Sequence, residues 1–135
     1  MLRLSKKVEY ALMAVKYIAA KPDGISVTAK EISEEYNISY ELLSKVLQRL
    51  SKFNIIKSFQ GIKGGYALSK SPKDISIIDI ISAIEINYKI TDCMNQNHSS
   101  TECEHLNNCC IRNPLLKLQK EIDKLFDSTT IYQIM

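Results

Sequence analysis

The first regular hydrophobic pattern in the chain predicts an amphipathic helix over residues 5–20. Its apolar side chains recur at i, i+3, i+4, i+7, i+10 and i+11 and share one face: Val8, Ala11, Leu12, Val15, Ile18 and Ala19. The sequence KPDG at 21–24 then interrupts the pattern with a proline and a glycine. A single apolar face indicates a helix that lies on a protein core with its other side in water.

Two shorter helical patterns follow closely. Thr28 and Glu31 have the spacing of a capping box, so a short helix is expected to begin at Thr28, and Asn37 favours its end. Ser39 is suited to cap a third helix, whose apolar positions share one face: Leu42, Leu43, Val46, Leu47, Leu50 and Phe53. A short helix, a break of three or four residues and a second helix are typical of the helix-turn-helix motif.

The pattern then changes to that of a β-hairpin. Strands are predicted over residues 55–59 and 65–68, on either side of a turn that contains Gly61, Gly64 and Gly65. A two-stranded hairpin placed directly after a helix-turn-helix is a wing, with Lys63 near its tip.

The second half of the chain has a different organisation. Ser76 and Asp79 predict a capped helix, after which residues 87–112 are polar and lack a regular pattern. Helical spacing resumes at Asn113 and Pro114 and continues to about residue 126. The apolar seam of this last helix consists of Leu115, Leu118, Ile122, Leu125 and Phe126. Because an exposed apolar seam needs a partner, we expect it to form the contact of a homodimer.

These elements predict a mainly α protein with one small β-hairpin. Residues 1–75 form a winged helix-turn-helix domain, and residues 76–135 carry a helix, a polar loop and a long C-terminal dimerisation helix. No signal peptide is recognised, and the apolar run IIDIISAI is too short for a membrane span. We therefore expect a cytoplasmic protein.

Charge is unevenly distributed along the chain. The net charge is +3, but residues 1–70 hold 12 Lys or Arg against 6 Asp or Glu, whereas residues 71–135 hold 6 against 9. A basic first half suits a surface that binds phosphates, because neutralising phosphates releases counterions. The same charges also fit an ordinary solvated face, so charge alone leaves both readings open.

The face of the third helix opposite its apolar stripe is the candidate DNA-reading surface. Polar side chains there have the hydrogen-bonding groups that contact base edges and phosphates, although an ordinary outer face looks similar. The predicted DNA-contacting residues are Thr28 and Ser39 at the two helix starts, Tyr40, Glu41, Ser44, Lys45, Gln48 and Arg49 on the helix, and Gln60, Gly61 and Lys63 on the wing. The partner would be double-stranded DNA.

All four cysteines lie in the polar loop, at Cys93, Cys103, Cys109 and Cys110. In a reducing compartment, clustered thiols are more often metal ligands or redox groups than structural disulfides. His98 and His105 lie in the same loop as competing ligands or as solvated side chains. Paired carboxylates and Ser-His or Cys-His arrangements are not recognised on the ordered elements, nor is a phosphate-cradling loop that leads into a helix, so an enzyme is not expected.

The chain resembles the IscR- and NsrR-type winged-helix regulators of the Rrf2 family. The resemblance rests on LRLSKKVEYAL, EISEEYNISYELLSKVLQRLSKFNIIKS, GIKGGY, IDIISAIE and the cysteine loop before the last helix, in the family's order. It implies a homodimeric transcription factor that binds a palindromic operator. It also implies an iron–sulfur cluster, 2Fe-2S rather than 4Fe-4S, through which iron, redox state or nitric oxide is sensed.

The resemblance also assigns ligands. It implies Cys93, Cys103 and Cys109, although nine residues separate the first two, more than the family's usual spacing. Arg112 stands where IscR-like members have a histidine ligand, so a fourth ligand is expected from Glu9 of the partner subunit, unless Glu9 is a plain surface residue.

Two alternatives remain open from the sequence. Cys110 could be a buried apolar thiol or a spare redox group, or it could replace Cys109 as the third ligand. The whole protein could instead be a cluster-free winged-helix regulator that senses through thiol oxidation or zinc.

Overall fold

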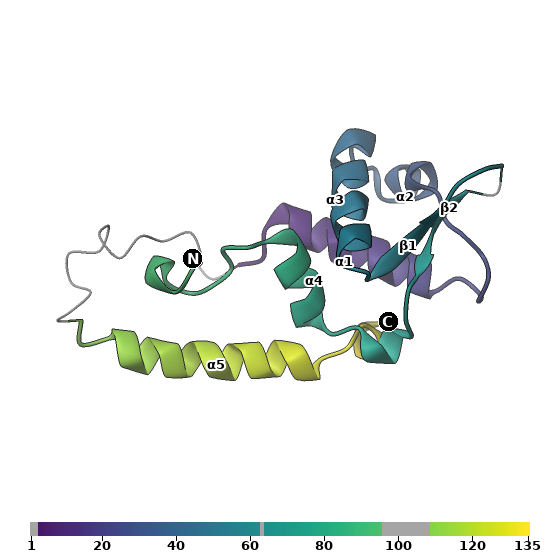
Figure 1. The fold of residues 1–135 in the computed structure, drawn as a ribbon. Helices are drawn as coiled ribbons and strands as arrows, with labels where there is room; N and C mark the ends of the chain where they lie inside the picture. Colours follow the sequence, from purple (N-terminus) through teal and green to yellow (C-terminus); the bar gives the residue numbers. More distant parts are fainter. Residues whose placement is uncertain (1–2, 63, 96–108) are drawn as a thin grey trace.

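The computed structural model describes residues 3–62, 64–95 and 109–135. The elements follow the predicted order, with the winged part at one end of a long C-terminal helix (Figure 1). They are α1 (Lys6–Ala19), α2 (Ala29–Tyr36), α3 (Tyr40–Lys52), β1 (Ile56–Phe59), β2 (Gly65–Leu68), the 3-10 helix η1 (Pro72–Asp74), α4 (Ile77–Ile84), the 3-10 helix η2 (Asp92–Met94), α5 (Arg112–Ser128) and α6 (Ile131–Ile134).

The helix starts follow local capping chemistry. The side chains of Thr28, Ser39 and Ser76 each accept a hydrogen bond from the first turn of the helix that follows. Ser76 and Asp79 form a complete capping box, and Asn37 ends α2 in the left-handed conformation with a φ of 53°. The predicted starts of α2, α3 and α4 are therefore confirmed.

The apolar stripe of α3 is narrower than the sequence pattern indicates. Leu43, Val46, Leu47 and Leu50 are buried, but Leu42 is only half-buried. Phe53, predicted to complete the stripe, is 48% exposed because it caps the end of α3, and the Arg49 guanidinium lies 5.3 Å from its ring centroid.

The hairpin pairs β1 with β2 in antiparallel register, from Ile56 opposite Leu68 to Phe59 opposite Gly65. Val27, just before α2, adds a bridge to Tyr66 through two backbone hydrogen bonds of 2.8 and 2.7 Å. Gly65 makes this approach possible, since its φ is 145° and a Cβ there would lie 2.6 Å from the Val27 carbonyl oxygen. The wing is thereby attached to the entry of the helix-turn-helix.

One hydrophobic core crosses the predicted domain boundary at residue 75. Helix α4 packs against α1 and α3, and Ile75, Ile80 and Ile81 are buried in the same cluster as Val15 and Leu47. Helix α5 packs against α4 and extends past it, away from the wing (Figure 1).

The C-terminus adds an element that the sequence pattern does not predict. Ile77 N–H donates to the Thr129 carbonyl and Ile131 N–H donates to the Ile75 carbonyl, both at 2.9 Å. Ile131 of α6 is fully buried in the core. Helix α5 itself begins at Arg112, slightly before the predicted Asn113, and continues to Ser128. Within the part of the chain that the structure describes, no helix is both long and apolar enough to cross a membrane.

Candidate nucleic-acid interface and cysteine segment

The outward face of α3 presents most of the predicted DNA-contacting side chains to solvent. Tyr40, Glu41, Lys45 and Gln48 are exposed, whereas Ser44 is half-buried. Lys45 Nζ lies 3.7 Å from a Glu41 carboxylate oxygen, and both side chains are largely exposed. Such an exposed pair is weak, so Lys45 is free to exchange Glu41 for a phosphate.

Arg49 is placed differently from the rest of this face. Its Nε donates a 3.1 Å hydrogen bond to the Ala83 carbonyl near the end of α4, and its side chain is half-buried. The guanidinium therefore connects α3 to α4, and only its remaining N–H groups are available to a ligand. This reduces its part in the predicted DNA contact and gives it a structural one.

Thr28 and Ser39, the two predicted DNA-contacting residues at helix starts, are exposed and cap their own helices. Thr28 Oγ1 accepts from Glu31 N–H at 3.1 Å, and Ser39 Oγ accepts from Leu42 N–H at 3.5 Å. Both mark helix N-termini, where free N–H groups and the helix dipole favour a phosphate.

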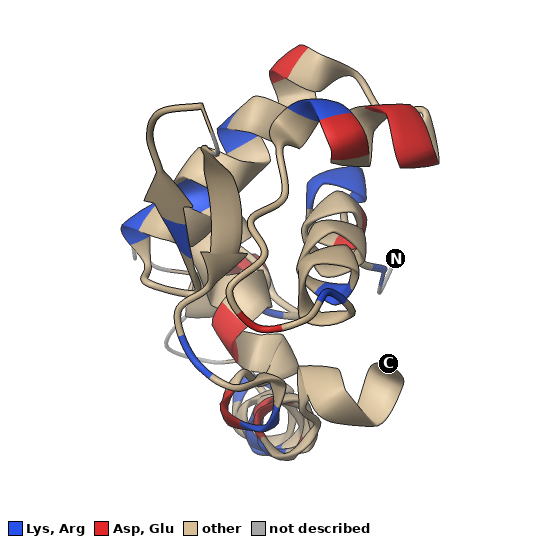
Figure 2. Ribbon diagram, turned by 90° about the vertical axis from the view of Figure 1, so that its right-hand side faces the viewer, with Lys and Arg blue, Asp and Glu red and all other residues tan. Residues whose placement is uncertain are grey.

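The wing tip projects from the hairpin with Gln60 and Gly61 exposed. Gly61 has a φ of 105°, and a Cβ on Gly64 would lie 2.8 Å from the Gly61 carbonyl oxygen, so the tight turn needs both glycines. Ile62 is fully exposed, and Lys63 lies outside the described residues. Figure 2 shows that Lys and Arg positions predominate on the side of the molecule that carries the hairpin, on the left in that view.

Three of the four cysteines fall within the described chain. Cys93 is half-buried in η2, Cys109 is half-buried before α5, and Cys110 is exposed. The exposure of Cys110 is incompatible with the predicted buried apolar thiol. Cys103, His98 and His105 lie outside the described residues. Among the residues that are described, no three His, Cys, Asp or Glu side chains gather as a metal site, and a three-thiolate site would require Cys103 as well.

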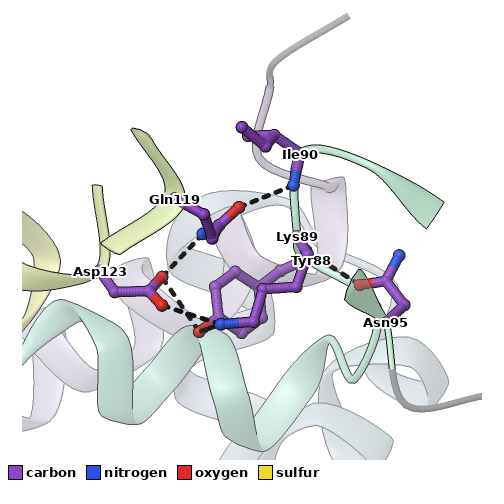
Figure 3. A network of polar contacts seen from close by, with 6 residues as sticks. All are labelled: Tyr88, Lys89, Ile90, Asn95, Gln119 and Asp123. Atoms are coloured by element: carbon purple, nitrogen blue, oxygen red, sulfur yellow. Dashed lines mark hydrogen bonds and ion pairs between the residues drawn. The ribbon is translucent and has the colours of Figure 1, made fainter. Parts of the chain in front are cut away.

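A polar network that sequence analysis missed holds the segment leading to Cys93. Gln119, only 4% exposed, accepts from Ile90 N–H through Oε1 and donates to Asp123 through Nε2, both at 2.8 Å (Figure 3). Asp123 also accepts from Tyr88 Oη at 3.2 Å and pairs with Lys89 Nζ at 2.8 Å. One signal was available: Gln119 interrupts the apolar spacing of α5.

The Lys89–Asp123 pair is electrostatically stabilised. Partial burial is the largest single influence and opposes the charge on each group, but the hydrogen bonds that each group makes and the attraction between their opposite charges together outweigh it. The pKa of Lys89 is consequently raised, with Tyr88 contributing, and the pKa of Asp123 is lowered, with Gln119 contributing.

Glu9, the predicted fourth ligand, lies in the first turn of α1. Its Oε2 forms an ion pair with Lys6 Nζ at 2.9 Å, and its side chain is 43% exposed. It lines a groove of about 1000 Å³ whose other walls include Lys89 and Gln119. Within one protomer, Glu9 and the segment leading to Cys93 therefore border the same open groove.

Comparison with known proteins identifies the family. The chain matches the model of Rrf2, described as an iron-dependent transcriptional regulator, over residues 4–135. It is 31% identical over 118 residues to the HTH-type transcriptional regulator NsrR of Halalkalibacterium halodurans, covering 87% of this chain and 75% of the relative.

Solved structures agree with this match. T. potens IscR is similar with a TM-score of 0.70 and 26% identity, covering 98% of this chain and 85% of that one. The oxidized form of Staphylococcus aureus CymR is similar with a TM-score of 0.73 and 25% identity, covering 98% and 94%. The proteins matched are regulators of transcription and not enzymes, which confirms the expectation from sequence. The chain has a winged helix-turn-helix and matches the family model along nearly its whole length, so it belongs to the Rrf2 family of DNA-binding transcriptional regulators.

Proposed function

We propose that the protein is a homodimeric regulator that binds a palindromic operator and senses iron, redox state or nitric oxide through an iron–sulfur cluster. The observation that carries the proposal is the arrangement of the cysteines. Cys93 and Cys109 lie within the segment that joins α4, which is packed on α3, to α5. A change at these thiols therefore acts between the DNA-reading part and the long helix.

The DNA contact is proposed to use the exposed face of α3 in the major groove. Lys45, Gln48 and Ser44 would reach phosphates and base edges, with Tyr40, Glu41 and the free part of Arg49 beside them. Thr28 and Ser39 would present helix N-termini to the backbone. The wing, with Gln60, Gly61 and Lys63, would reach the adjacent groove.

The dimer contact is proposed along α5. Ile111, Leu118 and Leu125 are each about half exposed or more, and they recur every seven residues. Leu115 and Ile122 lie between them and complete a four-three spacing, which is the pattern of helices that pair side by side. Phe126 packs on the core of its own protomer. Two copies related by a two-fold axis would match a palindromic operator.

The ligands are proposed to be Cys93, Cys103 and Cys109, with Glu9 of the partner subunit as the fourth. Thiolates are the ligands that iron–sulfur clusters prefer, and hydrogen bonds to sulfur adjust their reduction potential. Thr91 Oγ1 lies 3.3 Å from Cys93 Sγ and is placed to form such a bond. A bound cluster would supply a centre that is lost or oxidised under the sensed condition; 2Fe-2S is the form proposed.

One observation favours a cluster-free alternative. Cys110 is exposed and adjacent to Cys109, which suits a redox-active thiol, and a relative of similar fold is known in an oxidized form. In that case thiol oxidation, or zinc held by the same cysteines, would replace iron.

Anaerobic purification followed by Mössbauer spectroscopy and DNA selection tests the proposal. We expect a coloured protein with a cluster signal that enriches a two-fold symmetric sequence from random duplexes. A colourless protein with one zinc per chain that still enriches such a sequence would support the alternative. A protein whose duplex binding shows no salt dependence would contradict the DNA-binding role.

A further inference from the structure

The segment that carries Cys93 is attached to helix α5 by side chains of that helix. Ile90 N–H donates to Gln119 Oε1 at 2.8 Å, and Lys89 Nζ pairs with Asp123 Oδ2 at 2.8 Å. Both attachments lie within four residues of the cysteine. Because Gln119 and Asp123 are four residues apart on α5, they hold adjacent residues of the segment against one face of the helix (Figure 3).

The turn beyond these attachments is closed on itself. Lys89 N–H donates to Asn95 Oδ1 at 3.1 Å, so the side chain after the turn bonds back to the residue before it. Within the turn, Met94 N–H donates to the Thr91 carbonyl and Asn95 N–H donates to the Asp92 carbonyl. The Cys93 thiol is thus held in a compact loop whose base is fastened to α5.

Each polar side chain of the network has at least one partner, and the network is partly shielded from solvent. Gln119 uses both its carbonyl and its amide group, and both Asp123 oxygens accept hydrogen bonds. Buried polar networks that are complete specify one arrangement, because any slip leaves a buried group unpaired. If α5 moved by one turn relative to residues 88–90, Gln119 would lose its contact with the Ile90 N–H and would be a buried group without that partner.

We propose that Gln119 and Asp123 are positioning residues for Cys93. Through them, the position of the Cys93 thiol depends on the position of α5. Gln119 is buried and Asp123 is half-buried, whereas Leu118 and Leu125 of the proposed dimer seam are exposed. Helix α5 then has one face on the Cys93 segment and another on the partner subunit. The coupling holds for metal binding and for thiol oxidation alike, and its regulatory meaning rests on the proposed function.

The test uses full-length, reduced, metal-free protein and two variants, Gln119→Met and Asp123→Asn. The matched controls are Lys120→Met and Asp127→Asn, which make the same kinds of change at exposed positions of α5. Two rates are measured: alkylation of each cysteine by iodoacetamide, resolved by peptide mass spectrometry, and hydrogen exchange of the Ile90 amide. Cys110 and the core amides of α4 serve as internal references.

In Gln119→Met, Cys93 alkylation and Ile90 exchange should rise about fivefold or more, the factor that corresponds to one hydrogen bond, while Cys110 and the α4 amides change less than twofold. Asp123→Asn should give a smaller selective rise, and the controls none. Rates within twofold of wild type in both variants would overturn the proposal. A uniform rise at every site would also overturn it, because it marks general loosening and not positioning.

The outcome is separable from that of the cluster. If the wild type binds no iron but the variants show the selective rise in Cys93 alkylation and Ile90 exchange, the positioning role is supported and the cluster is contradicted. If the wild type binds iron but the variants show no selective rise in these two rates, the cluster is supported and the positioning role is contradicted.

Discussion

At the scale of single residues, Lys45 and Arg49 are two cations of α3 with different contacts. Lys45 is exposed and weakly paired, whereas Arg49 donates to the Ala83 carbonyl and stacks on Phe53. Helical spacing assigns both to the same surface, but only the fold shows which one is already used. The DNA contact is therefore expected to depend on Lys45 through electrostatics and on Arg49 through the placement of α3.

Replacing Lys45 by alanine should weaken DNA binding with little effect on folding. Loss of one phosphate contact per subunit, two in the proposed dimer, should reduce the slope of log K against log salt by about 1.8, or about 0.9 per contact, and leave the Tm unchanged. Fluorescence anisotropy on a selected duplex at several salt concentrations measures this. Lys117→Ala, an exposed lysine of α5, is the control, and an equal change in its slope would argue against the assigned face.

The Lys89–Asp123 pair predicts a pH dependence of stability. The pKa of Asp123 is lowered in the fold, so its contribution is present above the unfolded value of about 3.9 and is lost as the pH falls through the folded pKa. The pKa of Lys89 is raised, so its contribution is present below about 10.4 and is lost as the pH rises through the folded pKa.

Asp123→Asn should therefore destabilise the protein by about 1 kcal/mol near neutral pH and by almost nothing at strongly acidic pH. Urea unfolding at pH 7 and near pH 2.5 compares the two. A difference that stays constant between these pH values would show that the carboxylate charge contributes nothing.

At the scale of elements, local chemistry predicts helix starts well and long-range attachments poorly. Thr28, Ser39 and Ser76 cap their own helices, so three or four neighbouring residues contain the signal. Helix α6 has only four residues and is held by hydrogen bonds to residues 75–77, more than fifty positions away. The contacts of Arg49 with Ala83 and of Gln119 with Ile90 are likewise remote in sequence, and no periodicity contains them.

Sequence likewise predicts only part of the candidate site. The exposed α3 face and the wing follow from spacing and glycine placement. The contacts of Gln119 do not follow: its place in the apolar spacing of α5 marks the residue, but spacing does not show that it binds the Ile90 N–H.

Helix α5 carries the prediction for assembly. Leu118→Glu should place a carboxylate in the dimer seam and dissociate the dimer, since an unpaired charge is costly to bury. Leu118 is exposed in the protomer, so the monomer should stay folded by circular dichroism. Sedimentation measures the dissociation, with Lys120→Glu as the control; an intact Leu118→Glu dimer would place the contact elsewhere.

At the scale of the whole molecule, the C-terminus closes on the winged part. Ile131 is fully buried in the core that also contains α1, α3 and α4, and Thr130 bridges to Ser76. Helix α5 is consequently attached to the DNA-binding part at both ends of its packed region: through α4 and residues 88–90 on one side and through α6 on the other.

Ile131→Ala should accordingly destabilise the whole protein by about 2–5 kcal/mol, as for other large-to-small changes in a core. Ile134, on the same short helix but partly exposed, is the matched position, and Ile134→Ala should cost much less. Thermal unfolding compares them. Equal, small effects would mean that α6 is a dispensable tail.

We propose that three separated cysteines hold iron between the DNA-reading part and the proposed dimer helix. The most direct test is the iron, sulfide and zinc content of anaerobically isolated wild type and of the four single Cys→Ser variants. We predict iron with equal sulfide in wild type, its loss in Cys93→Ser, Cys103→Ser and Cys109→Ser, and its retention in Cys110→Ser. Stoichiometric zinc without iron in wild type, or equal iron loss from Cys109→Ser and Cys110→Ser, would contradict this ligand set.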